Sequence, residues 1–592
     1  ASHAPFGGNV VGLDMAAWRY FGVAPHQLSW AQSATLAVLP NAPSLIFPGK
    51  NQQRLLAKRN ALLHKLYTAE IIDKETYDLA LTEPLPTEPH PIPQLAPHLL
   101  AYASKTREGQ RITTSLPIDL QQKVSQIVAG YYSHYSQSEI YNMAALVVEV
   151  KTRKVLAYEG NTPTDENHQK DVDIIHAPRS TGSVLKPFLY AAMLHEGELL
   201  PTTLIPDVPT QIAGYSPQNF SNSFEGAVPA DMALAKSLNV PFVWLLRQFT
   251  TYRFYEVLQK LRLKNISRHP DHYGLSIILG GAESNLWDLA QAYTNLASEV
   301  NVFAATQQYR TAEFQSLSYM AGSPPDFGKA TTALPTIRAG ALYSMFSAMK
   351  EVNRPTDDVA WRYYESARKI AWKTGTSFGN KDAWAIGATP EYVVAVWVGN
   401  ATGEGRPTLT GVSYAAPVMF SIFNTLPHTT WFQQPLDDMR EVTICEQSGY
   451  LAKPECPQKL LRTTLAPKEI GQCPYHKLVH LTPDGQYQVN ASCQPVDQIY
   501  TKAWFVLPPV MEWYYKQQHV HYQSLPPFRS DCTEGVAQKA LDFVYPKHLS
   551  VIYTTKSFGG EQQPFVAKAA NRSGKLFWYI EDRKSTRLNS SH

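Results

Sequence analysis

Apolar side chains recur at helical spacing in the first part of the chain. Leu55, Leu62, Leu63 and Leu66 return every three, four or seven residues, as the buried face of a helix does. We therefore predict that residues 1–83 are helical. Six prolines follow, at positions 84, 86, 89, 91, 93 and 97. Because proline lacks an N–H donor and has a fixed φ, residues 84–142 are interpreted as a linker and a lead-in to the next domain.

Short apolar runs of a different kind fill residues 143–435. The pattern predicts a β-hairpin whose strands are Ala144–Val150 and Val155–Tyr158, joined by the polar turn Lys151–Arg153. It predicts a helix at Ser183–His195. Two further strands, rich in β-branched and aromatic residues, are predicted at Lys369–Trp372 and Tyr392–Val398. Helices grouped between strands of an antiparallel sheet make an α+β domain.

The sequence pattern changes twice in the last part of the chain. Residues 436–530 are predicted to be a loop-rich linker that carries disulfides. Short strands recur between Val536 and Ile580, so residues 531–582 are predicted to form a small C-terminal β-sandwich. Residues 583–592 break this pattern and are interpreted as a non-native tail.

Composition narrows the class of protein. With 592 residues, 44% hydrophobic and 17% charged, the chain is long enough for several folded domains. The net charge of +3 and the absence of a basic stripe argue against nucleic-acid binding. No run of 18 apolar residues occurs, so no segment of the sequence is expected to span a membrane.

The five cysteines all lie in the last quarter of the chain. Cys445, Cys456, Cys473 and Cys493 are clustered, and Cys532 stands apart. We expect the disulfides Cys445–Cys456 and Cys473–Cys493, because short loops close at the least entropic cost, with Cys532 unpaired or paired outside this chain. Free thiols are one alternative. A zinc site is another, since two histidines follow Cys473, but Cys445 and Cys456 lack the usual close spacing of zinc ligands.

Three short motifs carry the candidate chemistry. Ser183-Val-Leu-Lys186 places a hydroxyl and an amine one helical turn apart, with the serine expected at the start of its helix. A serine needs an adjacent base to become a nucleophile, and a desolvated lysine can be that base. Ser237-Leu-Asn239 adds a hydroxyl and a carboxamide. Lys373-Thr-Gly375, expected to follow a strand, adds a cation and a glycine that lets a ligand approach the backbone closely.

Each motif alone has an ordinary structural explanation. Ser183 and Lys186 are compatible with a plain helix N-terminus bearing a solvated lysine, and Ser237 and Asn239 with a helix cap. The third motif is compatible with a polar turn at a strand end. All three together, in this order, are typical of penicillin-binding proteins and serine β-lactamases.

The segments around the motifs strengthen this resemblance. Arg179–Tyr190, Ala235–Pro241 and Lys373–Ser377 with Asp382-Ala-Trp384 resemble the transpeptidase domain of class A penicillin-binding proteins, of the 1C type. Upstream, the segments that resemble the last third of the family 51 peptidoglycan glycosyltransferase are Ala4–Asn9, Tyr20–Gly22 and Ala37–Pro43.

The glycosyltransferase resemblance is incomplete. The family's early glutamate motif, E-D-x-x-F-x-x-H, does not occur in this sequence, so we expect glycosyltransferase activity of the full-length protein and not of this chain. Arg59–Leu63 resembles the last motif of that family. An amphipathic helix with a surface arginine explains this segment equally well.

The resemblance assigns roles to the motif residues. It implies that Ser183 is the nucleophile, Lys186 its base and Ser237 a proton relay toward the leaving amine. It further implies that Asn239 binds a substrate amide, and that Lys373 with Thr374, Gly375 and Thr376 receives the substrate's terminal carboxylate. The backbone N–H groups of Ser183 and Thr376 would form the oxyanion hole.

The implied function is a peptidoglycan D,D-transpeptidase that works through a serine acyl-enzyme, without a metal or an organic cofactor. Its expected partners are stem peptides, glycan strands, β-lactams and other cell-wall synthesis proteins. Its expected location is the periplasm, with an inner-membrane anchor in the full-length protein. A D,D-carboxypeptidase or β-lactamase and a non-catalytic penicillin-binding scaffold remain as alternatives.

Overall fold

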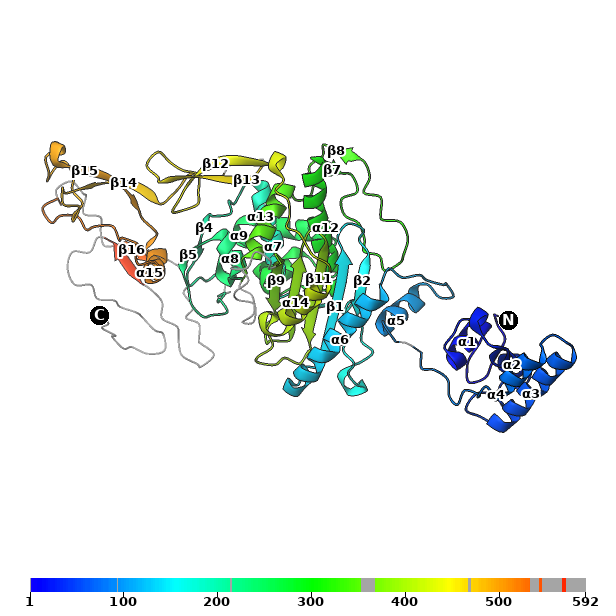
Figure 1. The fold of residues 1–592 in the computed structure, drawn as a ribbon. Coiled ribbons are helices and arrows are strands. Elements are labelled where there is room, and N and C mark those ends of the chain that lie inside the picture. The colour runs from blue at the N-terminus through cyan, green and yellow to red at the C-terminus, as the bar shows by residue number, and fades with distance from the viewer. Residues whose placement is uncertain are drawn as a thin grey trace, which may run out of the picture. The chain divides into compact units, whose positions relative to one another are not determined.

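The structure, a computed structural model, describes residues 2–92, 94–212, 216–352, 368–466, 470–532, 542–545 and 567–570. The chain divides into two compact units, Ala1–Leu95 and Ala96–His592, which are described separately (Figure 1).

The first unit is helical, as predicted. It contains α1 (Leu13–Phe21), α2 (Trp30–Val38), α3 (Gln52–Thr68) and α4 (Lys74–Thr82). Leu55 and Leu63 of α3 are fully buried, which confirms the face that the leucine spacing indicated. Ser29 caps α2 by accepting a hydrogen bond from the backbone N–H of Gln32.

The second unit is built on a five-stranded antiparallel sheet, in the order β2-β1-β11-β10-β9. The strands are β1 (Asn142–Glu149), β2 (Val155–Glu159), β9 (Ala371–Thr376), β10 (Asp382–Ala388) and β11 (Tyr392–Gly399). The predicted hairpin is present as β1 and β2. The third motif forms the end of β9 and does not follow the strand, because Thr376 still pairs with Ala383 of β10.

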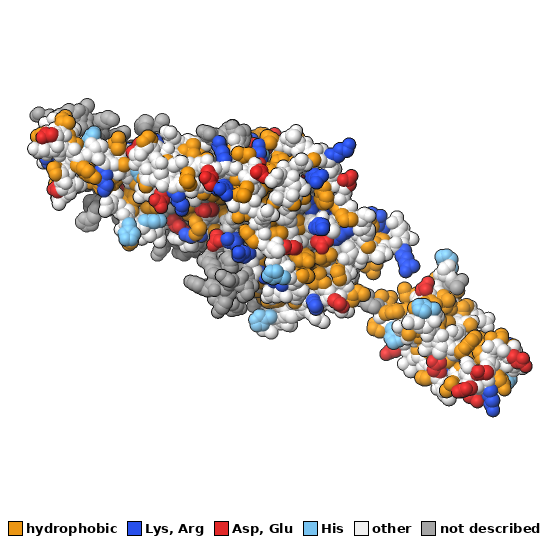
Figure 2. All heavy atoms as spheres, turned by 45° about the horizontal axis from the view of Figure 1, so that its top comes forward, with side chains coloured by type: hydrophobic (Ala, Val, Ile, Leu, Met, Phe, Trp, Pro, Cys, Tyr) orange, Lys and Arg blue, Asp and Glu red, His pale blue; other side chains and the backbone are white. Residues whose placement is uncertain are grey.

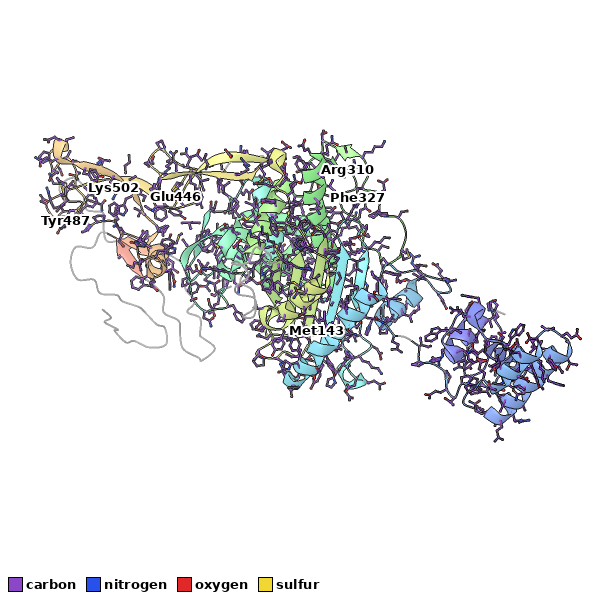
Figure 3. The ribbon with its side chains drawn as sticks, viewed as in Figure 1. Met143, Arg310, Phe327, Glu446, Tyr487 and Lys502 are labelled. Carbon is purple, nitrogen blue, oxygen red and sulfur yellow. A yellow bond between two sulfur atoms is a disulfide. The ribbon has the colours of Figure 1, made fainter. Side chains whose placement is uncertain are left out.

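Both faces of this sheet are covered by helices (Figure 1). On β1, Ala144, Leu146 and Val148 point into one core, and Met143 (labelled in Figure 3), Ala145 and Val147 point into the other. The first core is closed by α7 (Lys186–Glu196), α9 (Asn239–Phe249), α12 (Leu286–Thr306) and α13 (Ala339–Lys350); the second by α6 (Ile118–Tyr135) and α14 (Ala416–Thr425). Burial on both faces explains why β1 and β11 are largely continuous apolar runs in the sequence.

Residues 436–530 contain more regular structure than the loop-rich linker predicted from the sequence. Two antiparallel hairpins, β12 (Met439–Cys445) with β13 (Gln458–Thr464) and β14 (His476–Leu481) with β15 (Tyr500–Phe505), precede α15 (Pro509–Gln518). The strands were missed because much of their surface is exposed and polar. Glu441 and Arg462, for example, pair across β12 and β13 in a salt bridge of 2.6 Å.

The predicted C-terminal β-sandwich falls mostly outside the described residues. Its described part is one antiparallel pair, β16 (Asp542–Tyr545) with β17 (Lys568–Ala570). The tail, residues 583–592, lies wholly outside the described residues.

The described surface carries charges of both signs. Basic and acidic side chains are interspersed over the face seen in Figure 2, in keeping with the small net charge. Within the described ranges, no helix combines the length and apolar character needed to cross a bilayer.

Candidate active site

Ser183 lies in a turn between β3 (Arg179–Ser180) and α7, and its side chain is half-buried. The helix begins at Lys186, three residues later than predicted, because the turn uses tighter i→i+3 hydrogen bonds: Lys186 N–H donates to the Ser183 carbonyl (3.3 Å). On the other side, Thr181 N–H donates to the Ala282 carbonyl (3.0 Å). The turn is therefore fixed at both ends.

Two glycines bring this turn against β9. A Cβ atom on Gly375 would lie 2.7 Å from the Thr181 carbonyl oxygen, and one on Gly182 would lie 2.7 Å from the Thr376 nitrogen. Gly182 also has a φ of +50°, in the left-handed region. Side chains at these positions would hold the two segments apart, so the first and third motifs meet because both residues are glycine.

Lys186 points away from solvent into the second motif. Its Nζ donates to the carbonyl oxygens of Ser237 (2.8 Å) and Leu238 (3.0 Å) and to Oδ1 of Asn239 (2.6 Å). The side chain is fully buried. Burial, and after it the charge of Lys373, holds the pKa of the Lys186 ammonium well below its ordinary value. The alternative of a solvated lysine is therefore wrong.

Lys373 approaches the second motif from β9. Its Nζ donates to the hydroxyl of Ser237 (2.7 Å) and to the carbonyl of Thr374 (2.7 Å). Burial lowers the pKa of Lys373 to about 7. The alternative interpretation of Lys373 as part of a polar turn at a strand end is therefore excluded, because the residue lies inside the site.

Ser237 and Asn239 are held at the junction of α8 (Ala230–Ala235) and α9. Ser237 has a φ of +54°, a strained conformation for a residue with a side chain. Asn239 donates from its carboxamide to the Gln218 carbonyl (2.7 Å), and its backbone N–H donates to Oδ1 of Asn219 (2.9 Å). The supporting residues Gln218 and Asn219 were missed, since nothing in a single sequence marks them.

Thr374 and Thr376 are half-buried neighbours on β9, with Gly375 between them on the opposite face. The Thr376 hydroxyl accepts a hydrogen bond from Gly411 N–H (3.0 Å), at the start of the π-helical turn Gly411–Ala415. This fixes the hydroxyl and leaves its proton free to be donated.

In the first unit, Arg59 is not a surface residue. It is 1% exposed, and its guanidinium donates to the carbonyl oxygens of Glu83 (2.5 Å) and Leu81 (3.3 Å). The alternative of an amphipathic helix with a surface arginine is therefore wrong.

The predicted disulfides are also wrong. Cys493 pairs with Cys532, whereas Cys445, Cys456 and Cys473 are free and buried. Loop length favoured the shorter pairs, but the folded chain decides which thiols meet. Gln488 bridges to Phe528, and Arg529 N–H donates to the Gln488 carbonyl (3.0 Å), which brings the segment before Cys532 alongside the segment before Cys493.

Comparison with known proteins identifies the family of this chain. Residues 143–424 match the family model for the penicillin-binding protein transpeptidase domain, and residues 2–67 match the transglycosylase model. The fold is that of a penicillin-binding protein, and the three motifs lie within the matched transpeptidase domain. The chain belongs to the class A penicillin-binding proteins, in which a transglycosylase segment precedes the transpeptidase domain.

Individual relatives are similar over much of this chain. Penicillin-binding protein 1C of Escherichia coli is 32% identical over 72% of this chain and 52% of its own length. Penicillin-binding protein 1B of Vibrio cholerae is 25% identical over 69% of this chain and 53% of its own length. The chain thus spans about half the length of these curated relatives. A crystal structure of penicillin-binding protein 1A from Haemophilus influenzae shares the fold, with a TM-score of 0.55 at 17% identity, over 79% of this chain and 90% of that one.

Proposed function

We propose that this chain is a serine-type D-Ala-D-Ala transpeptidase that cross-links peptidoglycan stem peptides. The observation that carries the proposal is the meeting of three motifs. Two buried lysines, Lys186 and Lys373, both hydrogen-bond Ser237, and the turn that bears Ser183 lies against β9, the strand of Lys373.

In the acylation step, the Ser183 hydroxyl oxygen attacks the carbonyl carbon of the penultimate D-Ala. Lys186 accepts the hydroxyl proton, which it can do only as a neutral amine. The lowered pKa of Lys186 supports this role, because a buried lysine loses its proton more readily than a solvated one. The backbone N–H groups of Ser183 and Thr376 stabilise the oxyanion, and one such donor is worth about 10²–10³ in rate in proteases.

Collapse of this intermediate breaks the bond to the terminal D-Ala. Ser237 passes a proton to the leaving amine and is resupplied through the hydrogen bond from Lys373. The product is an ester between Ser183 and the shortened stem. The amine of a second stem then attacks the ester and loses a proton to Ser237 and, through it, to Lys373. Lys186 returns its proton to the departing Ser183 oxygen, so that Ser183 is freed and the cross-link is formed. Asn239 and the hydroxyls of Thr374 and Thr376 bind the donor stem, and Gly375 lets it approach the backbone.

β-Lactams enter the same scheme as analogues of the terminal D-Ala-D-Ala and acylate Ser183. The working partners are stem peptides and glycan strands, and the working location is the periplasm, with the anchor of the whole protein in the inner membrane. Polymerisation of glycan strands belongs to the whole protein in this proposal, since the glutamate motif of the glycosyltransferase does not occur in this chain.

The test uses glycan strands that bear pentapeptide stems, with and without an added acceptor amine, analysed for released D-Ala and cross-linked dimers. We expect both products from the wild type and neither from Ser183→Ala. Ser104→Ala is the control, because Ser104 is exposed on α5 (Pro97–Thr106) and its hydroxyl donates to the Ala101 carbonyl of its own helix. Release of D-Ala without dimers would mean a carboxypeptidase. Penicillin binding without D-Ala release would mean a scaffold, and either result would refute the proposal.

A further inference from the structure

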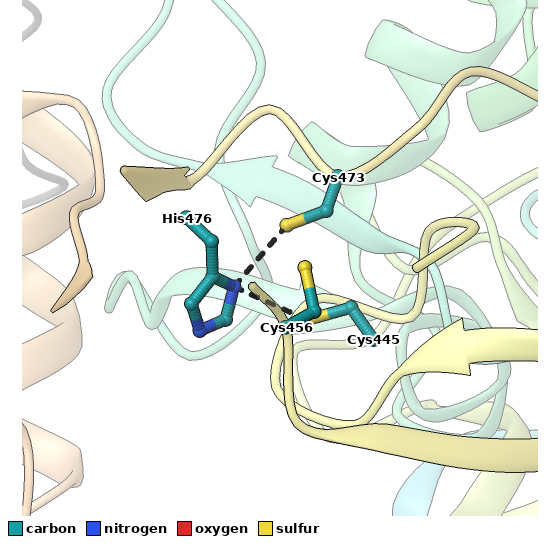
Figure 4. Close-up of side chains that lie close together, drawn as sticks. All are labelled: Cys445, Cys456, Cys473 and His476. Carbon is teal, nitrogen blue, oxygen red and sulfur yellow. Dashed lines mark hydrogen bonds between the residues drawn. The ribbon is translucent and has the colours of Figure 1, made fainter. Parts of the chain in front are cut away.

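Three buried cysteines and a histidine meet where the two C-terminal hairpins adjoin (Figure 4). They are Cys445, Cys456, Cys473 and His476, and their sulfur and nitrogen atoms all lie within 4.8 Å of one another. Nδ1 of His476 is 3.3 Å from Sγ of Cys445 and 3.4 Å from Sγ of Cys473. None of the four residues is more than 7% exposed.

Separate segments of backbone deliver these side chains. Cys445 is the last residue of β12, and Cys456 lies in the loop that leads to β13. Cys473 is held by its N–H, which donates to the Leu451 carbonyl (2.8 Å), and His476 is the first residue of β14. Glu446, labelled in Figure 3, marks the end of β12 at which they converge. The fold thus joins residues that their spacing in the sequence kept apart.

Two of the sulfur atoms also accept hydrogen bonds. The Lys453 N–H donates to Sγ of Cys456 (3.4 Å), and the Ser448 hydroxyl donates to Sγ of Cys473 (3.2 Å). Donors of this kind stabilise negative charge on sulfur and orient it, as the outer contacts of metal ligands do.

We propose that Cys445, Cys456, Cys473 and His476 bind a structural zinc ion. Three thiolates and one imidazole are a common tetrahedral ligand set for zinc, with ligand atoms about 3.5–3.8 Å apart. The two distances from Nδ1 of His476 to sulfur, 3.3 Å and 3.4 Å, are close to these values, and the other ligand atoms lie within 4.8 Å of one another. Since protein ligands fill all four positions and solvent is excluded, the site is structural and has no open position for a substrate. Zinc binds cysteine as the thiolate, so binding releases the thiol protons.

This assignment reverses the preference for disulfides drawn from the sequence. Three cysteines cannot all pair with one another, and a disulfide between any two would give the imidazole of His476 no function in the cluster. His480, the second histidine after Cys473, is not a ligand: its exposed ring bonds the Thr501 hydroxyl (2.8 Å).

The ion would fasten the C-terminal segment to the transpeptidase domain. The three cysteines pack in one apolar cluster with Leu204 of β4 (Leu204–Asp207) and Ala227 of β5 (Gly226–Pro229). The Leu204 N–H donates to the Ser448 carbonyl (2.9 Å). At Gly449, with a φ of +70°, a Cβ atom would lie 1.9 Å from the Thr202 carbonyl oxygen. The loop between two ligands therefore lies directly on the domain that contains Ser183.

The first measurement is the metal content of the chain. The protein is purified without chelators, and its metals are quantified by elemental analysis. We expect one zinc per chain, lost in Cys473→Ser and in His476→Ala. The matched control is His480→Ala, which should keep one zinc. Cys493→Ser, which removes a cysteine outside the cluster, should also keep it.

The second measurement needs only the wild type and does not depend on whether a variant folds. Replacement of zinc by Co²⁺ should give the intense visible bands of a tetrahedral site and a thiolate-to-cobalt charge-transfer band. Wild-type protein without stoichiometric zinc, or a native disulfide mapped between any two of the three cysteines, would overturn the proposal. Zinc retained equally by both ligand variants would overturn it as well. None of these outcomes bears on the transpeptidase proposal.

Discussion

Two buried lysines converge on a single serine, one at its carbonyl and one at its hydroxyl. Lys186 and Lys373 both reach Ser237, at 2.8 Å and 2.7 Å. Burial lowers the pKa of both ammonium groups, and the charge of Lys373 lowers that of Lys186 further. A lysine that acts as the base for a serine must be neutral, because only the neutral amine can accept the hydroxyl proton.

Lys186→Ala should lower the rate of penicillin acylation by about 10²–10⁴, the usual contribution of a general base. Lys186→Arg should not restore it, because arginine stays protonated and cannot accept the serine proton. The measurement is the rate of labelling by a fluorescent penicillin. Lys170→Arg, at an exposed lysine paired with Glu166, serves as the control. An arginine variant at position 186 that acylates at the wild-type rate would show that Lys186 is not the base.

Lys373 should make folding stability depend on pH. Its pKa is about 7 when folded, below its ordinary value near 10.5, so between these values the unfolded chain binds the extra proton. Stability should therefore rise with pH above 7, by at most about 1.4 kcal/mol per pH unit, and gain nothing from this group below pH 7.

The check compares thermal unfolding of the wild type and Lys373→Met at several pH values from 6 to 9. The difference in unfolding free energy between the two should shift in favour of the wild type as the pH rises above 7. A difference that stays flat, or that shifts the other way, would show that Lys373 is not buried as an unfavourable charge.

At the scale of elements, the site forms because the turn that bears Ser183 lies in contact with strand β9. Gly375→Ala places a methyl group 2.7 Å from the Thr181 carbonyl oxygen and 2.9 Å from a methyl of Val184. We expect a loss of about 1–3 kcal/mol in stability and of about tenfold to a hundredfold in acylation rate, as β9 moves away from the turn.

Gly130→Ala is the matched control for this substitution. Gly130 lies within α6 with no atom inside 4 Å of an added Cβ, so alanine there should raise stability by up to about 1 kcal/mol and leave acylation unchanged. Equal acylation by the two variants would contradict the role given to Gly375.

Secondary-structure elements could be predicted from the sequence where burial requires a regular pattern of apolar residues. The hairpin of β1 and β2 and the strand β11 are apolar on both faces, so they could be predicted. Strands β12 and β13 could not, because their cross-strand contacts involve charged side chains such as Glu441 and Arg462. The start of α7 was placed three residues early, since a tight turn and a helix share the same local pattern.

The same limit applies to side chains that meet only in the folded chain. The three motifs could be grouped because their order resembles a known family. Gln218 and Asn219, which hold Asn239, have no such signal. The cysteine pairs were wrong because chain entropy ranks loops by length, while the contact of Cys493 with Cys532 follows from how distant segments pack.

At the scale of the whole molecule, the disulfide and the transpeptidase site should be separable. The Cys493–Cys532 bridge closes a separation of 39 residues, worth about 4 kcal/mol in the loop-entropy model. Cys493→Ser should increase hydrogen exchange in β14 and β15 while penicillin acylation stays within about twofold of wild type. A large loss of acylation would mean that the bridge supports the site.

The central claim is that Ser183 forms the acyl-enzyme. The most direct test is peptide mapping by mass spectrometry after reaction with benzylpenicillin. We predict one penicilloyl group, on the peptide that contains Ser183, and none in Ser183→Ala, whose thermal unfolding should stay close to wild type because one half-buried hydroxyl contributes about 1 kcal/mol. An adduct on another residue, or labelling that persists in Ser183→Ala, would contradict the account.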